Sequence, residues 1–352
     1  MRSSLKLLSF IMTGWLHAAT VDFDFDINMG YRRDGLIWDA KAQGAAFATN
    51  WNQLNLFQLG GLFHLQACDR LYVRGSGDYG FLINGHNTLQ RPYDVNLDFS
   101  QFSLSGTGQE SILATRINGS TWDVSLALGF SLQALHNSSH WTLSPLCGYS
   151  YYGQDFFMSN AVGTQEWLMT SLLTAPTGVF NAIEPGGTNQ HETCCQWQGP
   201  WVGFDLDCGI NDNWHCFGTY EYHFGWLTLH SSESFLTQAP LPAAFNETLT
   251  FVEGESWKSS GHFATGQECS LGFEYTFSSS GYTSWGDHWF VGLRGGWKHW
   301  SCHQNPAKLT INPLTPTNAE PQSVPQVEKP QATLTKVEWT SWSALLNIGY
   351  HF

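Results

Sequence analysis

The stretch TKVEWTSWSALLNIGYHF, residues 335–352, decides the fold class of this chain. From Trp342 onward every second residue is apolar, in the series Trp342, Ala344, Leu346, Ile348, Tyr350 and Phe352. Such alternation is typical of a β-strand with one apolar face. Chain ends usually fray, so a hydrophobic strand in this position favours a closed sheet in which the last strand pairs with the first. An ordinary sheet strand at a domain end is the alternative.

The opening residues predict export. Arg2 and Lys6 precede the apolar run Leu7–Leu16, and small residues follow at Ala18 and Ala19. This order is typical of a secretory signal, here residues 1–19 with cleavage near Ala18 or Ala19. The apolar run is too short to cross a bilayer as a helix. The mature chain, residues 20–352, is therefore expected outside the cytoplasm.

Composition favours a membrane β-protein over a soluble one. Charged residues make up 12% of the chain, about half of the roughly 25% typical of soluble domains. Aromatic residues make up 15%, including 17 tryptophans. The net charge is −14, and removal of Arg2 and Lys6 would leave 13 basic against 29 acidic residues, or −16. This excess of negative charge argues against a nucleic-acid partner.

Period-2 patterning recurs along the chain. In 21–33 the odd positions are apolar up to Tyr31, whereas Asp22, Asp24 and Asp26 lie on the other face and are expected to line the interior. In 121–134 the even positions are apolar, so Leu128 should face lipid and Ser131 the lumen. The expected strands are 21–33, 51–66, 70–82, 121–134, 141–157, 197–209, 213–230, 263–278, 286–301 and 336–352.

The connections between these strands alternate in length. Short turns are expected at 67–70, 136–140, 210–213 and 279–285, and long loops at 34–50, 83–120, 158–196, 231–262 and 303–335. This asymmetry is typical of an outer-membrane barrel with short periplasmic turns and long extracellular loops. The sequence thus predicts an all-β fold, a transmembrane antiparallel up-and-down barrel of about ten strands. The proline-rich segment 303–335 is expected to be an extended, surface-exposed loop.

The positions of tryptophan and cysteine add two further expectations. Tryptophans near strand ends should form interfacial girdles, namely Trp51, Trp122, Trp141, Trp197, Trp214, Trp285 and Trp339. The eight cysteines have no CxxC spacing, so a zinc or thioredoxin-type motif is not predicted. In an oxidising compartment they either form disulfides or behave as small apolar side chains. Adjacent Cys194 and Cys195 would reach different partners more easily than each other.

Three segments carry a family resemblance. Residues 50–80, NWNQLNLFQLGGLFHLQACDRLYVRGSGDYG, resemble the second and third strands of the omptin outer-membrane proteases. The block 263–301 and the tail LLNIGYHF resemble the end of the same ten-stranded barrel. The opening DINMGYRRDGLIWD, residues 26–39, is similar to outer-membrane proteins of chlamydia-type bacteria, including the Protochlamydia family. That resemblance implies an envelope in which disulfide-linked partners are expected.

The omptin resemblance raises a protease hypothesis that the residues do not support. Omptins place an Asp-x-Asp pair after strand three and an Asp-x-His pair after strand seven, which together activate a water. Here the first loop offers Asp94 and Asp98 at the wrong spacing, and the later region offers His230 and Glu233 in the wrong order. Asp22, Asp24 and Asp26 have tight spacing on a strand, as do Asp205 and Asp207, and we interpret both groups as lumen-lining carboxylates. No GxSxG, HExxH or P-loop pattern occurs.

The expected function is therefore a structural or surface-interaction role in the bacterial outer membrane, with no catalytic, cofactor-binding or metal-binding residue predicted. A porin-like pore is the first alternative and an omptin-type protease the second. Inward-facing charges on the expected strands could either pair with one another or hydrate a narrow path; they are Asp123, Glu221, His223, Glu274, Arg294 and Lys298. The expected surroundings are outer-membrane lipid and lipopolysaccharide.

Overall fold

The computed structural model consists of β-strands and short turns. It describes residues 21–42, 45–67, 70–99, 102–114, 117–136, 139–159, 162–171, 179–184, 190–211, 213–240, 248–277, 288–316 and 327–351. Within these ranges no helix is long and apolar enough to cross a membrane. The predicted signal segment 1–19 lies outside them.

The described strands are long. They are β1 (Val21–Ala42), β2 (Ala45–Ala67), β3 (Leu71–Phe99), β4 (Phe102–Ala114), β5 (Ile117–Phe130), β6 (Leu132–His136), β7 (Ser139–Ser159), β8 (Val162–Ser171), β9 (Val179–Glu184), β10 (Gln190–Gly209), β11 (Trp214–Pro240), β12 (Thr248–Thr276), β13 (His288–Pro316) and β14 (Val327–His351).

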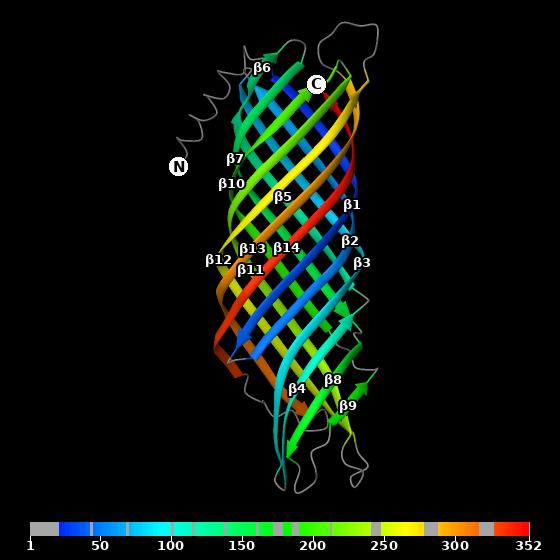
Figure 1. Ribbon diagram of the computed structural model, residues 1–352, viewed down its shortest axis with the longest axis vertical. Coiled ribbons are helices and arrows are strands. Elements are labelled where there is room, and N and C mark those ends of the chain that lie inside the picture. Colours follow the sequence, from blue (N-terminus) through cyan, green and yellow to red (C-terminus); the bar gives the residue numbers. More distant parts are fainter. Residues whose placement is uncertain are drawn as a thin grey trace, which may run out of the picture.

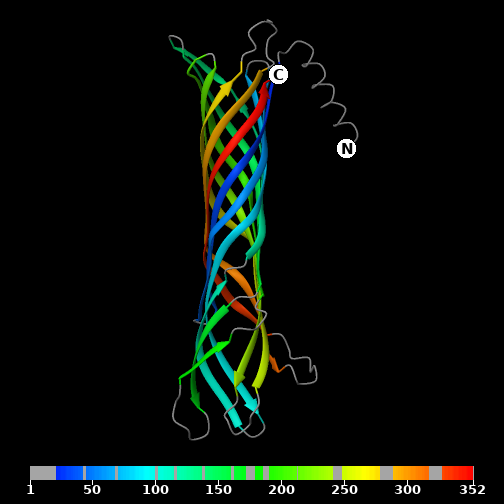
Figure 2. The ribbon, with the colours of Figure 1, turned by 90° about the vertical axis from the view of Figure 1, so that its right-hand side faces the viewer.

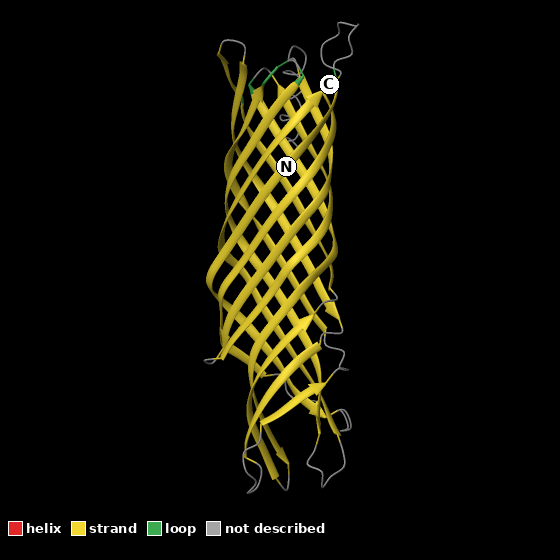
Figure 3. Ribbon diagram, turned by 45° about the vertical axis from the view of Figure 1, so that its right-hand side comes forward, coloured by secondary structure: helices red, strands yellow, loops and turns green. Residues whose placement is uncertain are grey.

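Ten of these strands close into an antiparallel barrel, as the sequence predicted. Around the ring they run β1, β2, β3, β5, β7, β10, β11, β12, β13 and β14. β14 pairs with β1 from His351 opposite Asp24 to Ala332 opposite Ala42, which closes the barrel. β6 continues the line of β5 beside β7, whereas β4, β8 and β9 extend the sheet from β3 beyond the ring. Figure 3 shows the tilted lattice of strands.

The two ends of the barrel differ. At the turn end lie the C-terminus and the short turns after β2, β6 and β10, all at positions that the sequence predicted. At the opposite end, which we call the projecting end, the strands continue into an extension beside which β4, β8 and β9 lie (Figures 1 and 2). β3, β12 and β13 each have 29 residues. Such a strand has a contour length of about 95 Å, whereas about 9–11 tilted residues cross a bilayer.

The prediction of long loops was therefore wrong for most of their length. Residues 34–42 belong to β1, and β2 begins at Ala45 after a short connection. β11 likewise runs to Pro240, and β13 and β14 extend into the proline-rich segment 303–335 from both sides. The described prolines are accommodated within the sheet. Pro306 pairs opposite Thr333, and a register shift beside Ala307 leaves Pro330 outside the regular pairing, an irregularity where proline is tolerated.

The barrel has two zones with opposite polarity. In the zone near the turns the outer face is apolar, with Phe25, Ile27, Met29 and Tyr31 of β1 between 37% and 50% exposed. Arg33 is the next residue on the same face, and Asp39 and Lys41 follow further along it, so the apolar belt ends after Tyr31. On β14 the change falls at the matching level, because Trp342 lies opposite Arg33. The belt therefore matches the bilayer, and the projecting zone matches water.

The lumen reverses this pattern. Within the belt it holds polar and charged side chains, and in the projecting zone it holds an apolar core. We call this core the tryptophan plug; its largest members, each with 0 or 1% exposure, are Trp38, Trp51, Trp197, Trp257, Trp300 and Trp339. The girdle prediction was thus wrong for Trp51, Trp197 and Trp339, which point inward. Trp141 and Trp214 are 43% and 46% exposed beside the turns.

Candidate functional site

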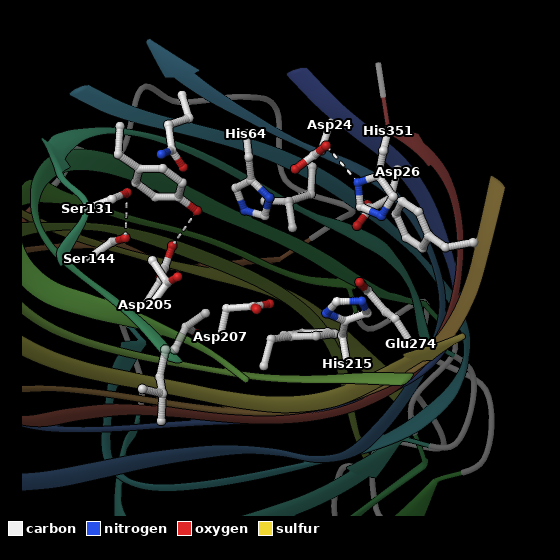
Figure 4. A pocket seen from close by; sticks show the side chains of 18 of the residues that line it. Asp24, Asp26, His64, Ser131, Ser144, Asp205, Asp207, His215, Glu274 and His351 are labelled. Carbon is white, nitrogen blue, oxygen red and sulfur yellow. Dashed lines mark hydrogen bonds and ion pairs between the residues drawn. The ribbon is translucent and has the colours of Figure 1, made fainter. Parts of the chain in front are cut away.

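The lumen near the turn end contains a cavity of about 310 Å³. Asp24 and Asp26 of β1 and Asp205 and Asp207 of β10 line it, as Figure 4 shows. Both carboxylate groups predicted to line the lumen thus meet in one cavity, although Asp22 is exposed rather than buried. Other titratable lining residues are His64, Tyr72, His215, Glu274, Arg294 and His351.

Several contacts hold the cavity wall. His351 Nδ1 lies 2.7 Å from Asp24 Oδ1, and Tyr72 donates to Asp205 Oδ2 over 3.0 Å. The hydroxyl groups of Ser131 and Ser144 lie 3.1 Å apart, which confirms that Ser131 faces the lumen. Four aspartates and one glutamate face a single arginine among the lining residues, so the cavity favours cations over anions.

A layer of ion pairs lies deeper in the lumen, between the cavity and the tryptophan plug. Arg32 donates Nε to Asp34 Oδ1 at 2.8 Å and Nη1 to Asp123 Oδ2 at 2.9 Å. Lys298 Nζ lies 3.0 Å from Asp123 Oδ2 and 3.1 Å from Glu268 Oε1. Each base is therefore shared between two carboxylates. This confirms that Asp123 and Lys298 face inward and pair with opposite charges.

Arg74 extends the layer to the cavity. Its guanidinium pairs with Asp205, which lines the cavity, and with Glu221. The guanidinium carbon also lies 4.9 Å from the ring centroid of Trp201. Inward-facing charges buried at this depth must be compensated, and Arg74 compensates carboxylates of both β10 and β11.

Glu221, His223 and Glu268 form a compact group within this layer. Glu221 of β11 and Glu268 of β12 are direct partners across the strand pair, and Gly266 is the partner of His223. One ligand-type atom from each of the three side chains lies within 4.8 Å of the other two. His223 Nε2 is 3.2 Å from Glu221 Oε2, while His223 Nδ1 is 3.1 Å from Ser150 Oγ.

Aromatic rings cover this group on the plug side. The ring of Trp300 lies 4.9 Å from that of His223 and 5.4 Å from that of Tyr152. A Cβ atom at Gly266 would come within 2.5 Å of the Trp300 ring, so glycine is needed at that position for close packing. The Tyr152 hydroxyl donates to Glu268 Oε2 over 3.1 Å.

A second polar cluster lies inside the tryptophan plug, at the projecting end. His191 Nε2 is 2.9 Å from Ser231 Oγ, 3.0 Å from Thr193 Oγ1 and 3.5 Å from Glu233 Oε1. Its Nδ1 is 3.0 Å from Asn87 Nδ2. These five side chains come from three strands, β3, β10 and β11, and are at most 5% exposed. A serine and an imidazole within hydrogen-bonding distance suit nucleophilic chemistry, but burial at this level leaves no surface for a peptide substrate.

The omptin-like positions do not assemble. His230 points outward, where its Nε2 is 3.4 Å from Ser256 Oγ, whereas Glu233 of the same strand is buried toward His191. The two residues therefore lie on opposite faces of β11. The backbone of Asp94 pairs with Thr107 and that of Asp98 with Ser103 in the β3–β4 hairpin; their side chains lie outside the described part of the structure.

Sequence reasoning missed several residues of these groups. His191 was assigned to a long loop, although the alternation of Gln190, His191, Glu192 and Thr193 continues the pattern of β10 upstream. Arg32 and Arg74 lie at inward positions of predicted strands and could have been found by the same parity. The pairing of Glu221 with Glu268 depends on strand register, which no local pattern gives.

Comparisons with known proteins agree with this architecture. The family model described as Protochlamydia outer membrane protein matches residues 26–352. The outer membrane protease OmpT of Escherichia coli aligns with a TM-score of 0.54 at 12% identity, covering 94% of this chain and 97% of OmpT. At that identity the likeness shows the fold alone.

Other comparisons add less. A FadL homologue of Pseudomonas aeruginosa aligns with a TM-score of 0.24 at 8% identity, covering 94% of this chain and 90% of the homologue. No curated protein matches the chain. The family match spans nearly the whole chain, and the structure has the closed strand topology of outer-membrane barrels. The chain belongs to the Protochlamydia outer membrane protein family and resides in the bacterial outer membrane.

Proposed function

We propose that this protein is a closed outer-membrane barrel with a structural or surface-interaction role. Its apolar belt contacts lipid and lipopolysaccharide, and its projecting zone presents strands and hairpins to the cell exterior. The orientation follows from the short turns, which lie at the periplasmic side in outer-membrane barrels. The projecting zone, with its extra strands β4, β8 and β9, is the surface on which partners would bind.

The filling of the lumen is the observation that carries this proposal. Six tryptophans in the plug have 0 or 1% exposure, and Arg32, Asp34 and Asp123 beneath them are at most 3% exposed. A barrel of about eight to ten strands has an interior that side chains can fill, whereas open porins have about 16–18 strands. Ions entering the turn-end cavity would meet the ion-pair layer and then the plug.

Single-channel recording tests this proposal against the porin alternative. Purified, refolded protein in a planar bilayer should give no stable conductance steps. Refolding in the presence of lipopolysaccharide should give the same absence of steps. A double Trp38→Ala, Trp339→Ala variant is the matched control, because it removes two rings of the plug. Stable conductance steps from the wild-type protein would contradict a structural role and support the porin-like pore.

A protease assay tests the enzymatic alternative. The protein, refolded with lipopolysaccharide, should leave a library of basic peptides intact. Cleavage that persists after purification and is lost in a double Asp94→Ala, His230→Ala variant would support an omptin-type activity. Cleavage lost in Ser231→Ala or His191→Ala instead would assign activity to the cluster in the plug.

A further inference from the structure

We infer that Glu221, His223 and Glu268 form a binding site for one divalent transition-metal ion of the Zn²⁺ class. Glu and His provide the oxygen and nitrogen ligands that such ions bind. The three residues come from β11 and β12 at the depth of the ion-pair layer. The role of the ion would be to complete the charge balance of this layer and to join the two strands.

The first argument is the charge count. Two ion-pair clusters, which meet at the cross-strand pair of Glu221 and Glu268, together contain five carboxylates, those of Asp34, Asp123, Asp205, Glu221 and Glu268. Three bases serve them, namely Arg32, Arg74 and Lys298. Five negative charges against three positive charges leave the layer two positive charges short when His223 is neutral. One divalent cation supplies that deficit, and uncompensated buried charge is costly.

The second argument is the strand register. Glu221 and Glu268 are direct cross-strand partners on the inward face, and like charges directly opposite one another destabilise a sheet. Arg74 and Lys298 relieve this repulsion in part, but each of them also serves an aspartate. A cation between the two glutamates would remove the repulsion at its source.

The third argument is the orientation of the imidazole. His223 Nε2 and Glu221 Oε2 face each other at 3.2 Å, neither atom has a hydrogen bond to any other described residue, and the side chain of His223 has 0% exposure. With Nδ1 protonated and donating to Ser150 Oγ, Nε2 directs its lone pair at the glutamates. A metal-bound histidine characteristically donates its other ring N–H to such a partner. The 3.2 Å between His223 Nε2 and Glu221 Oε2 is near the roughly 3.4 Å expected between two tetrahedral zinc ligands.

The cavity offers a path of entry from the periplasm. Its lining includes Asp24, Asp26 and Asp207, and it reaches the layer at Asp205, which is paired with Arg74. Arg74 in turn pairs with Glu221. An acidic cavity raises the local concentration of cations. Only Arg74 lies between the cavity residue Asp205 and the proposed ligand Glu221.

Titration of the refolded, chelator-treated protein tests the inference. Calorimetry with Zn²⁺ should give one ion per chain, and Co²⁺ should give the visible absorption of a low-symmetry nitrogen–oxygen site. Loss of a partner outside the coordination sphere already weakens metal binding about 10–100-fold, so His223→Gln and Glu268→Gln should each weaken it by at least about 100-fold. Ser150→Ala should give the smaller, outer-sphere loss.

Glu274→Gln is the matched control, because it removes a cavity carboxylate outside the site. It should retain wild-type affinity. Equal Zn²⁺ binding by wild type and His223→Gln would place the ion at the cavity histidines and overturn the inference, as would a wild-type protein that binds none. If the variants do not refold, the wild-type Co²⁺ spectrum decides alone: a purely octahedral, water-like spectrum contradicts the assigned ligands.

Discussion

At the residue scale, the face on which a side chain lies determines its environment. Leu128 is 53% exposed on the lipid side of β5, while Ser131, three residues on, is 6% exposed and lines the cavity. Arg32 and Arg33 differ in the same way, since Arg32 is buried in the lumen and Arg33 is exposed. Strand parity alone predicted the positions of Leu128 and Ser131, because alternation holds wherever one face meets lipid.

Leu128→Arg should be much more destabilising than Ser131→Arg. Arginine at the bilayer midplane costs about 2–4 kcal/mol, and Leu128 lies within the apolar belt of β5. Ser131→Arg places its charge in a cavity that Asp205 and Asp207 line, so a small change is expected. Equilibrium unfolding in lipid vesicles measures both free energies. Equal losses would mean that the lumen and lipid faces of the segment 121–131 are misassigned.

Arg32→Gln should cost about 3–5 kcal/mol, because it leaves buried carboxylates without their partner. Arg32 pairs with Asp34 and Asp123 and lies over the Trp339 ring, 5.4 Å from its centroid. Arg33→Gln is the control on the exposed face and should change stability by no more than about 0.5 kcal/mol. The same unfolding measurement compares them, and a loss in Arg33→Gln as large as that in Arg32→Gln would argue against the lumen ion pairs.

At the element scale, β10 and β11 bring two thiols together. Cys208 and Cys216 are direct partners across the hairpin beside the turn; both are free thiols, and Cys208 is 7% exposed although its strand position is an outward one. Directly opposed residues have Cα separations of about 4.5–5.5 Å, within the roughly 4.4–6.8 Å that a disulfide requires. No local pattern predicts this pairing, because the two cysteines become neighbours only through the register that the turn sets.

Export to an oxidising compartment should therefore join Cys208 and Cys216. Peptide mass spectrometry of non-reduced protein from outer membranes should find the cross-linked peptide, lighter by two hydrogens than the thiol pair. Cys147, which is exposed on the apolar belt, serves as the unpaired control. Alkylation of both Cys208 and Cys216 without prior reduction would contradict the prediction and leave them as small apolar side chains.

The limits of prediction also lie at this scale. Apolar alternation located each ring strand where it crosses the bilayer, so the ten-stranded closure and the turns near 67–70 and 210–213 were predicted correctly. Apolar alternation did not predict the strands beyond the belt, because the outer face becomes polar there. Strand extensions such as 34–42 were therefore predicted to be loops. The clusters of lumen side chains were not predicted for another reason. His191, Ser231 and Asn87 are far apart in the sequence and come together only when the barrel closes.

At the scale of the whole molecule, one continuous barrel has two zones of opposite polarity. The belt zone has lipid outside and charges inside, and the projecting zone has water outside and tryptophans inside. The apolar core of the projecting zone resembles that of a soluble protein, so this zone requires no bilayer to exclude water from its interior. It can therefore hold the surface strands at a fixed distance from the membrane.

The boundary between the zones can be located on a single strand face. Lys336 and Ala344 both point outward on β14, at levels opposite Asp39 and Tyr31 respectively. Lys336→Cys should gain one label over wild type when intact cells are treated with a membrane-impermeant maleimide, because it lies in the projecting zone. Ala344→Cys should gain none, since lipid covers the belt. Labelling of Lys336→Cys only after the outer membrane is opened would place the projecting zone in the periplasm, and equal labelling of both variants would place the belt outside the bilayer.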